Sequence, residues 1–182
     1  SMADYHVEEY VREMNLAAVK LARDLADEYT AKNPDKPRFV AGSVGPTNKT
    51  CSMSPDVNNP AYRALSYDEL AASYQQQMEA MLEGGVDAIL IETIFDTLNA
   101  KAAIFAAEQA MKATGVEVPV MLSVTVSDIG GRTLSGQTLD AFLASVQHAN
   151  IFSVGLNCSF GARQLKPFLE QLAARAPYYI SA

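Results

Sequence analysis

Short apolar segments alternate with helix-like segments along the chain, and this alternation constrains the fold more than any single motif. Residues 88–91 are apolar without interruption and residues 120–126 are rich in β-branched side chains, as is typical of buried strands in a parallel sheet. The expected strands begin near residues 39, 88, 120, 152 and 178. The last three intervals are about 32, 32 and 26 residues, each close to the length of one βα unit. The pattern therefore predicts an α/β fold with about five parallel strands.

The segments between the expected strands carry helix signals. Ser66 and Glu69 form a capping box at the start of one helix, and the Gly-Gly pair that follows this helix is its stop. Asp96 or Thr97 can cap the next helix. The polar loop over residues 132–138 can supply a turn and the cap of a helix expected over about 139–149. Residues 47–64 have no helical period and form a long loop. The first helix is expected over residues 5–32, with a buried face whose apolar members recur every three or four residues. That face comprises Val7, Tyr10, Val11, Met14, Ala18, Leu21, Leu25 and Tyr29.

Two parallel architectures fit this alternation, the (β/α)8 barrel and the doubly wound open sheet. No Gly-x-Gly-x-x-Gly string follows the first strand, so the dinucleotide-binding version of the open sheet lacks support. A complete barrel has eight strands and about 250 residues, whereas this chain has 182 residues, opens on a helix and stops within a strand pattern. We therefore expect a partial (β/α)8 TIM barrel that forms one incomplete domain, 1–182, with helices flanking the strands.

Charge and composition exclude several classes of partner. The chain holds 14 Lys and Arg against 21 Asp and Glu, a formal net charge of −7, which disfavours binding to nucleic acid or to anionic membranes. No apolar run approaches the ~20 residues that a membrane span needs, and the N-terminal residues do not resemble a signal peptide. Cys51 and Cys158 are too few for a disulfide framework. We expect two reduced thiols in a cytoplasmic protein.

Polar residues at the carboxyl ends of strands are the candidates for function in either architecture. Glu92 follows four apolar residues, and its carboxylate could hold a substrate ammonium group or act as a base. Cys158 ends another strand and could be a nucleophile, a metal ligand or a small buried side chain. Cys–His catalysis is disfavoured because His148 precedes a strand and so lies at the opposite end of the sheet. Cys51, in the long loop, carries no such signal.

Several strings occur in one order over the whole chain, and together they resemble the homocysteine-binding domain of cobalamin-dependent methionine synthase. Each string is weak alone, but their number and order make the resemblance specific. The strings are Phe39-Val40-Ala41-Gly42, Gly45-Pro46-Thr47-Asn48-Lys49-Thr50, Ser54-Pro55, the segment 89–97 (Ile-Leu-Ile-Glu-Thr-Ile-Phe-Asp-Thr), Asn99-Ala100-Lys101-Ala102-Ala103, the segment 131–138 (Gly-Arg-Thr-Leu-Ser-Gly-Gln-Thr) and Gly155-Leu156-Asn157-Cys158.

The resemblance implies a (β/α)8 barrel that binds zinc through three cysteines. One of these follows Gly-Leu-Asn and corresponds to Cys158, while the other two lie in a Gly-Gly-Cys-Cys string that this sequence lacks. The chain is thus similar to approximately strands three to seven of the larger domain. Glu92 corresponds to the family's contact to the homocysteine ammonium group, and Asn157 would orient the ligand strand or contact the substrate. No residue is expected to act as a catalytic acid or base.

Zinc explains why the family needs cysteines. The metal deprotonates a bound thiol, and three protein ligands leave the fourth tetrahedral position to the sulfur of homocysteine. In this family methylcobalamin, on a separate module, donates the methyl group, so the implied partners are homocysteine and the folate and cobalamin modules. One cysteine is too few for a tight site, and the isolated chain is expected to be inactive and to hold zinc weakly or not at all.

Two other functions fit the same sequence. One is a betaine- or S-methylmethionine-dependent homocysteine S-methyltransferase, although the string at residues 131–138 resembles the cobalamin-dependent branch. The other is a non-catalytic chain that only self-associates, because a partial barrel exposes two sheet edges that can pair with a second copy.

Overall fold

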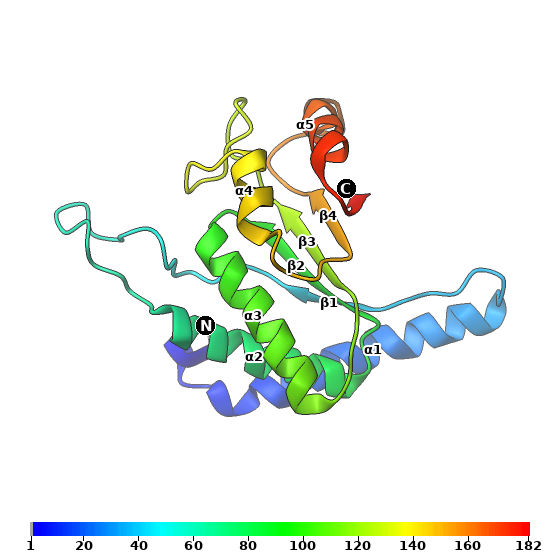
Figure 1. Cartoon of the computed structure of the whole chain (residues 1–182). Coiled ribbons are helices and arrows are strands. Elements are labelled where there is room, and N and C mark those ends of the chain that lie inside the picture. Colours follow the sequence, from blue (N-terminus) through cyan, green and yellow to red (C-terminus); the bar gives the residue numbers. More distant parts are fainter. Residues whose placement is uncertain (1) are drawn as a thin grey trace.

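A single parallel sheet organises the computed structural model, which describes residues 2–182 (Figure 1). The predicted domain also includes residue 1, which lies outside the described residues. The strands are β1 (Ala41–Val44), β2 (Ala88–Ile94), β3 (Val120–Val124), β4 (Ser153–Leu156) and β5 (Tyr179–Ser181). The helices are α1 (Val11–Lys32), α2 (Tyr67–Gly84), α3 (Thr97–Thr114), α4 (Leu139–Val146) and α5 (Ala162–Arg175), with two 3-10 turns, η1 (Met2–Tyr5) and η2 (Glu8–Tyr10), before α1.

The order of the strands identifies the architecture. The five strands are parallel and neighbour one another in chain order, β1-β2-β3-β4-β5. A doubly wound sheet reverses its strand order at a switch point, whereas a barrel adds each strand beside the one before it. The structure therefore confirms the expected partial (β/α)8 barrel, with the edges of this sheet at β1 and β5.

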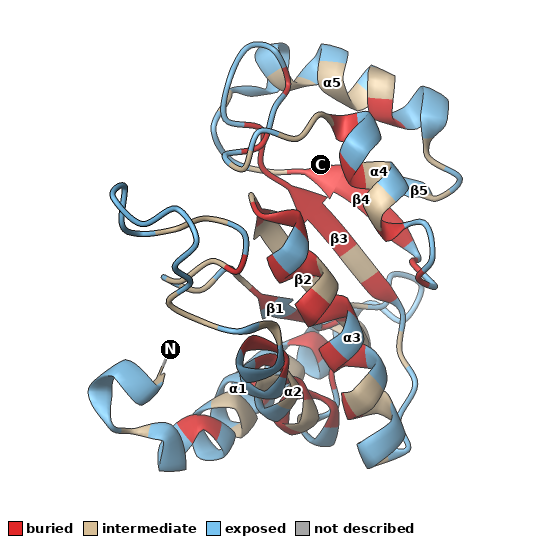
Figure 2. Ribbon diagram, turned by 60° about the vertical axis from the view of Figure 1, so that its left-hand side comes forward, coloured by how far each residue is buried: buried red, intermediate tan, exposed pale blue. Residues whose placement is uncertain are grey.

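One face of the sheet carries the core. Residues in register on neighbouring parallel strands point to the same face, and one such row is Val44, Ile91, Leu122 and Val154, all buried. In Figure 2, β3 and β4 are coloured mostly as buried. This face packs against the helices, and a Cβ added to Gly42 in β1 would come within 2.9 Å of the Met81 sulfur in α2. In a complete barrel the opposite face would line the interior.

Local signals in the sequence form as expected around the core. Ser66 and Glu69 make the capping box of α2, and Gly85 ends this helix in the left-handed conformation. Asp96 caps α3 by accepting hydrogen bonds from the backbone of Leu98 and Asn99. The boundaries differ by a few residues: β3 ends at Val124 and α4 at Val146, both earlier than the sequence predicts.

The first helix corrects two expectations. It begins at Val11 instead of residue 5, because the preceding residues form the 3-10 turns η1 and η2. Its buried residues are Val11, Val19 and Ala26, and the close approach of Val19 to Gly84 shows that this side of α1 packs against α2. The face predicted to be buried is largely exposed instead: Tyr10, Met14, Leu21, Leu25 and Tyr29 are 48–69% exposed. Small and β-branched residues allow the closer helix contact, so the larger apolar stripe faces outward.

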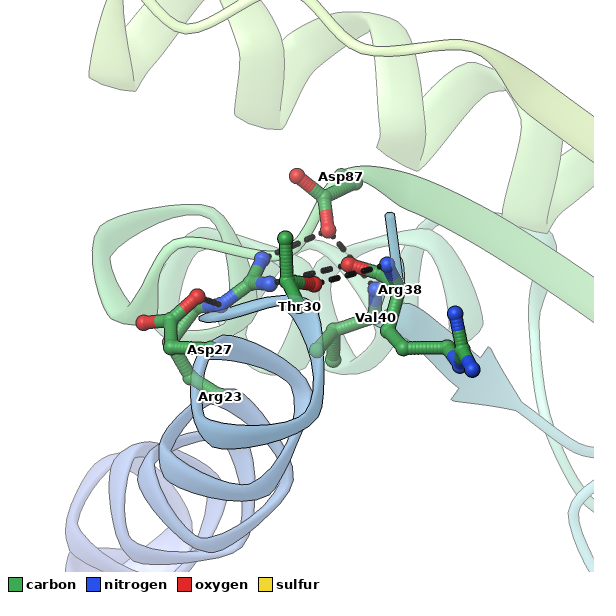
Figure 3. A network of polar contacts seen from close by, with 6 residues as sticks. All are labelled: Arg23, Asp27, Thr30, Arg38, Val40 and Asp87. Carbon is green, nitrogen blue, oxygen red and sulfur yellow. Dashed lines mark hydrogen bonds and ion pairs between the residues drawn. The ribbon is translucent and has the colours of Figure 1, made fainter. Parts of the chain in front are cut away.

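A polar network attaches the C-terminal half of α1 to the start of the sheet (Figure 3). The Arg23 guanidinium donates to Asp87 at 2.6 Å and to the Arg38 carbonyl at 3.3 Å. The Asp87 carboxylate also accepts from the Val40 backbone N–H at 2.7 Å. The hydrogen bond to Asp87 raises the pKa of Arg23, which remains charged. This network fixes the segment that enters β1. Together with the packing of Val19 against α2, it anchors α1 to the start of the sheet although most of the helix surface is exposed.

No helix within residues 2–182 has the length and apolar character that crossing a bilayer requires.

Candidate functional site

The sequence-predicted residues lie at the carboxyl edge of the sheet. Glu92 belongs to β2 and is half-buried, and its carboxylate accepts a hydrogen bond from the Ser43 hydroxyl of β1. The β2–β3 register shifts between Ile91 and Ile94, so Glu92 sits in an irregular part of the strand. Its carboxylate therefore points to the Ser43 side of the sheet, opposite the helix-covered core.

Asn157 follows β4 and connects it to β2 across the intervening strand. Its Oδ1 accepts from the Thr93 N–H at 3.2 Å and from the Ser123 hydroxyl at 2.9 Å. Its Nδ2 donates to the Thr93 hydroxyl at 2.9 Å. Asn157 is therefore tied to the residue directly after Glu92, which lies 64 residues earlier in the chain.

Cys158 is exposed and Cys51 is buried, so the two thiols lie in different environments. Cys158 adopts a left-handed backbone conformation with φ of 62°, and its sulfur lies 3.4 Å from the Asn157 Nδ2. Cys51 lies in the loop after β1, and desolvation by burial raises the pKa of its thiol. A buried thiol of that kind is a poor source of a thiolate ligand.

The first turn of α3 attaches the long loop after β1. The Asp96 side chain is 2% exposed and accepts from the backbone and the hydroxyl of Ser52, besides capping its own helix. Asn99 is 5% exposed; its Oδ1 accepts from the Cys51 N–H at 2.8 Å and its Nδ2 donates to the Lys49 carbonyl at 3.1 Å. Sequence reasoning identified Asp96 only as a cap and missed Asn99. The available signal was a polar side chain among alanines on a buried helix face.

The same turn also receives the loop after β3. The Ser135 N–H donates to the Phe95 carbonyl at 3.1 Å, and the Thr97 hydroxyl bonds the Gln137 side chain. Thr138 caps α4, as the sequence suggested for this loop. Residues 95–99 thus fix the loops after β1 and after β3, the two strands that flank β2.

A small pocket opens at the same edge and is lined by Pro46, Tyr74, Glu92, Thr93 and Asn99, among others. The Tyr74 hydroxyl donates to the Gly45 carbonyl at 3.2 Å, and burial raises the pKa of Tyr74 to about 12. A larger groove of about 1140 Å³ lies at the opposite end, beside the starts of β3, β4 and β5. The small pocket has a volume of about 20 Å³, which is room for about one water molecule and not for an amino acid. Because parallel-sheet proteins work at the carboxyl edge, the better candidate is the open edge that carries Glu92, Asn157 and Cys158.

A parallel sheet of barrel order with polar side chains along its carboxyl edge defines the class of (β/α)-barrel proteins, whose sites lie on the loops after the strands. Residues 1–182 match the sequence model of the family described as homocysteine S-methyltransferase. The chain belongs to the homocysteine S-methyltransferase family.

Solved structures of the homocysteine methyltransferase MmuM from Escherichia coli are similar to this chain. The apo form has a TM-score of 0.72 at 22% identity, and the match covers 93% of this chain and 59% of that chain. The metallated form has a TM-score of 0.72 with 57% of that chain covered, and the oxidized form has 0.65 with 65% covered. The chain thus spans about three fifths of the length of these structures, and at this identity the likeness shows the fold alone.

Proposed function

We propose that this chain, residues 1–182, is the central part of the homocysteine-binding barrel domain of a cobalamin-dependent methionine synthase. In the proposal Glu92 binds the ammonium group of homocysteine, and Cys158 is one ligand of a zinc ion. The observation that carries the proposal is that Asn157, the neighbour of Cys158, is bonded to Thr93, the neighbour of Glu92, at one edge of the sheet. Family membership supports homocysteine as the methyl acceptor.

Glu92 has the chemistry that an amino-acid substrate requires. A carboxylate offers about four acceptor positions, and Ser43 donates to one oxygen of this carboxylate. The remaining positions can accept from an ammonium group, and such charge-assisted hydrogen bonds are stronger than neutral ones. Glu92 and Ser43 would therefore orient the amino end of homocysteine while its thiol points toward the end of β4.

Zinc needs more donors than the described residues bring together. Catalytic zinc takes three protein ligands in a tetrahedral arrangement, and Cys158 provides one exposed thiol. Residues 2–182 contain no group of three or more His, Cys, Asp or Glu side chains placed to hold a metal ion. The residues present thus do not fit a complete zinc site. In the proposal the other two thiolates belong to the Gly-Gly-Cys-Cys string that the resemblance implies.

Elemental analysis tests this incomplete site. We expect well under one zinc per chain in the wild type, and no further loss in Cys158→Ser, because a single thiolate binds zinc weakly. Cys51→Ser is the matched control, since it removes the other thiol of the chain. One zinc per chain that disappears in Cys158→Ser and persists in Cys51→Ser would contradict this prediction, because the chain would then complete a site around Cys158.

Titration with L-homocysteine tests the role of Glu92. We expect weak binding that shifts the amide NMR signals of Glu92 and Thr93. The affinity should be at least about tenfold lower in Glu92→Gln, because a hydrogen bond to a charged group contributes about 1.5–3 kcal/mol. Glu83→Gln, on the exposed surface of α2, is the control. The same affinity in Glu92→Gln, or equal binding of 4-mercaptobutanoate, which differs from homocysteine only in lacking the amino group, would exclude the proposed contact.

The methyl donor is the finer part of the proposal. The string at residues 131–138 resembles the cobalamin-dependent branch, and in the structure it forms the loop that attaches to Phe95 and Thr97. The alternative is a betaine- or S-methylmethionine-dependent enzyme. Competition between methylcobalamin and betaine as donors, in a longer relative with this string, distinguishes the branches.

Self-association is the second candidate function. Edge strands with unpaired backbone groups can pair with another chain, and β1 and β5 are the edges of this sheet. Tyr179 in β5 is 71% exposed. A chain that only self-associates would give no homocysteine-dependent NMR shift at Glu92, so the titration above separates the two candidates.

A further inference from the structure

Left-handed backbone is concentrated at the two strand ends that carry the candidate site. Within residues 2–182 the non-glycine residues with positive φ are His6, Thr93, Cys158 and Ser159. Thr93 directly follows Glu92, and Cys158 and Ser159 are the two residues after Asn157. The left-handed conformation is unfavourable for a β-branched residue such as Thr93, whose φ is 59°. Strain of this kind persists only where the surrounding structure enforces it.

The Asn157 carboxamide supplies that constraint on Thr93. Its Oδ1 accepts from the Thr93 N–H at 3.2 Å, and its Nδ2 donates to the Thr93 hydroxyl at 2.9 Å. The Ser123 hydroxyl of β3 donates to the same Oδ1 at 2.9 Å and so fixes the carboxamide from the strand in between. Thr93 is therefore held through both its backbone and its side chain by Asn157, the residue that follows β4.

The conformation of Thr93 affects the position of Glu92. The left-handed turn at Thr93 coincides with the register shift between Ile91 and Ile94, which makes Glu92 part of the irregularity. At the other end of the link, the Asn157 Nδ2 lies 3.4 Å from the Cys158 sulfur. A change at Thr93 would therefore reach the carboxylate through the backbone and the thiol through Asn157.

We propose that Thr93 is a positioning residue: its hydroxyl and its left-handed backbone, held by Asn157, set the position of the Glu92 carboxylate relative to the Cys158 thiol. This inference rests on the proposed function for the meaning of that spacing, because homocysteine would have to reach both groups at once. The link itself is a property of this chain and can be measured without substrate or metal.

Hydrogen exchange and a fluorine label test the link in the 182-residue chain. The label is a trifluoroacetonyl group on Cys158, in a Cys51→Ala background so that one thiol reacts. Thr93→Val removes the hydroxyl at nearly constant shape. We expect amide exchange at residues 92–95 and 157–160 to accelerate about tenfold, the effect of losing one hydrogen bond of ordinary strength. The fluorine signal of the label on Cys158 should shift or broaden, although Thr93 and Cys158 lie far apart in the chain.

Three variants make the result specific. Thr93→Ser keeps the hydroxyl and should behave like the wild type. Thr97→Val is the matched control, because this buried threonine bonds Gln137 and not Asn157; it should leave the Cys158 signal unchanged. Thr93→Gly adopts positive φ without strain and lacks the hydroxyl, so it provides the same test if Thr93→Val does not fold.

Unchanged exchange at residues 157–160 and an unchanged Cys158 signal in Thr93→Val would overturn the proposal, as would an equal response in Thr97→Val. Neither measurement uses homocysteine or zinc. A chain that binds no homocysteine would therefore defeat the proposed function and leave this result standing. If homocysteine binds as expected but the Cys158 label does not respond to Thr93→Val, the proposed function stands and the positioning role of Thr93 is wrong.

Discussion

Asp96→Ala is expected to lower the free energy of unfolding by about 3 kcal/mol and to release the loop after β1. The Asp96 carboxylate is 2% exposed and accepts from the backbone of Leu98, Asn99 and Ser52 and from the Ser52 hydroxyl. Loss of a helix cap costs about 1 kcal/mol, and each buried donor left without an acceptor costs about 1–3 kcal/mol. Urea unfolding followed by circular dichroism measures the change.

Limited trypsin digestion measures the expected release of the loop after β1. Lys49 and Arg63 lie in or beside the loop that Asp96 and Asn99 hold, so cleavage at these residues should accelerate in Asp96→Ala. Asp68→Ala is the matched control, because Asp68 is an exposed carboxylate in the first turn of α2. Its effect should stay within about 0.5 kcal/mol. Wild-type stability and wild-type cleavage in Asp96→Ala would show that the loop is held by other contacts.

Gly155→Ala is expected to separate β5 from β4. A Cβ at this position would lie 2.1 Å from the Ser181 carbonyl oxygen and 2.4 Å from its hydroxyl. The obstacle is backbone, so β5 has to move by more than 1 Å to reach the ordinary contact distance of about 3.5 Å. The pairing of Ser153 with Tyr179 and of Gly155 with Ser181 would then be lost. Hydrogen exchange should show loss of protection at residues 179–181.

Gly45→Ala is the matched control for this substitution. Gly45 also lies at the end of a strand, and a Cβ there would meet nothing within 4 Å. We expect its exchange pattern and unfolding midpoint to match those of the wild type. Retained protection of residues 179–181 in Gly155→Ala would mean that β5 can shift without losing its hydrogen bonds.

The parts of the fold that local chemistry specifies could be predicted. The capping box at Ser66 and Glu69 and the cap at Asp96 form as expected, because their partners lie within three residues in the chain. The strands were found for a related reason, since buried parallel strands need apolar residues along their length. The positions of Glu92 and Cys158 at the carboxyl edge then follow from the direction of the strands.

The location of the candidate site could be predicted from the sequence, but the hydrogen-bond partners of its residues could not. Asn157 was expected to orient the ligand strand or to contact the substrate, and the structure shows its carboxamide bound to Thr93 and Ser123. Asn99 was missed because its bonds go to Lys49 and Cys51, about fifty residues away. No local pattern encodes such a partner, since it depends on how the loop after β1 passes over α3.

The amino-acid sequence by itself determined the α/β class, the order of the elements, several of their caps and the strand ends that carry the candidate residues. These follow from periodicity, helix capping and the burial of apolar strands, all of which act over a few residues. The tertiary structure alone decided which face of α1 is buried, where the Asn157 carboxamide binds and how closely β5 approaches Gly155. Those outcomes depend on contacts between segments far apart in the chain: Val19 is buried where α1 meets Gly84 of α2, while Leu21 is exposed.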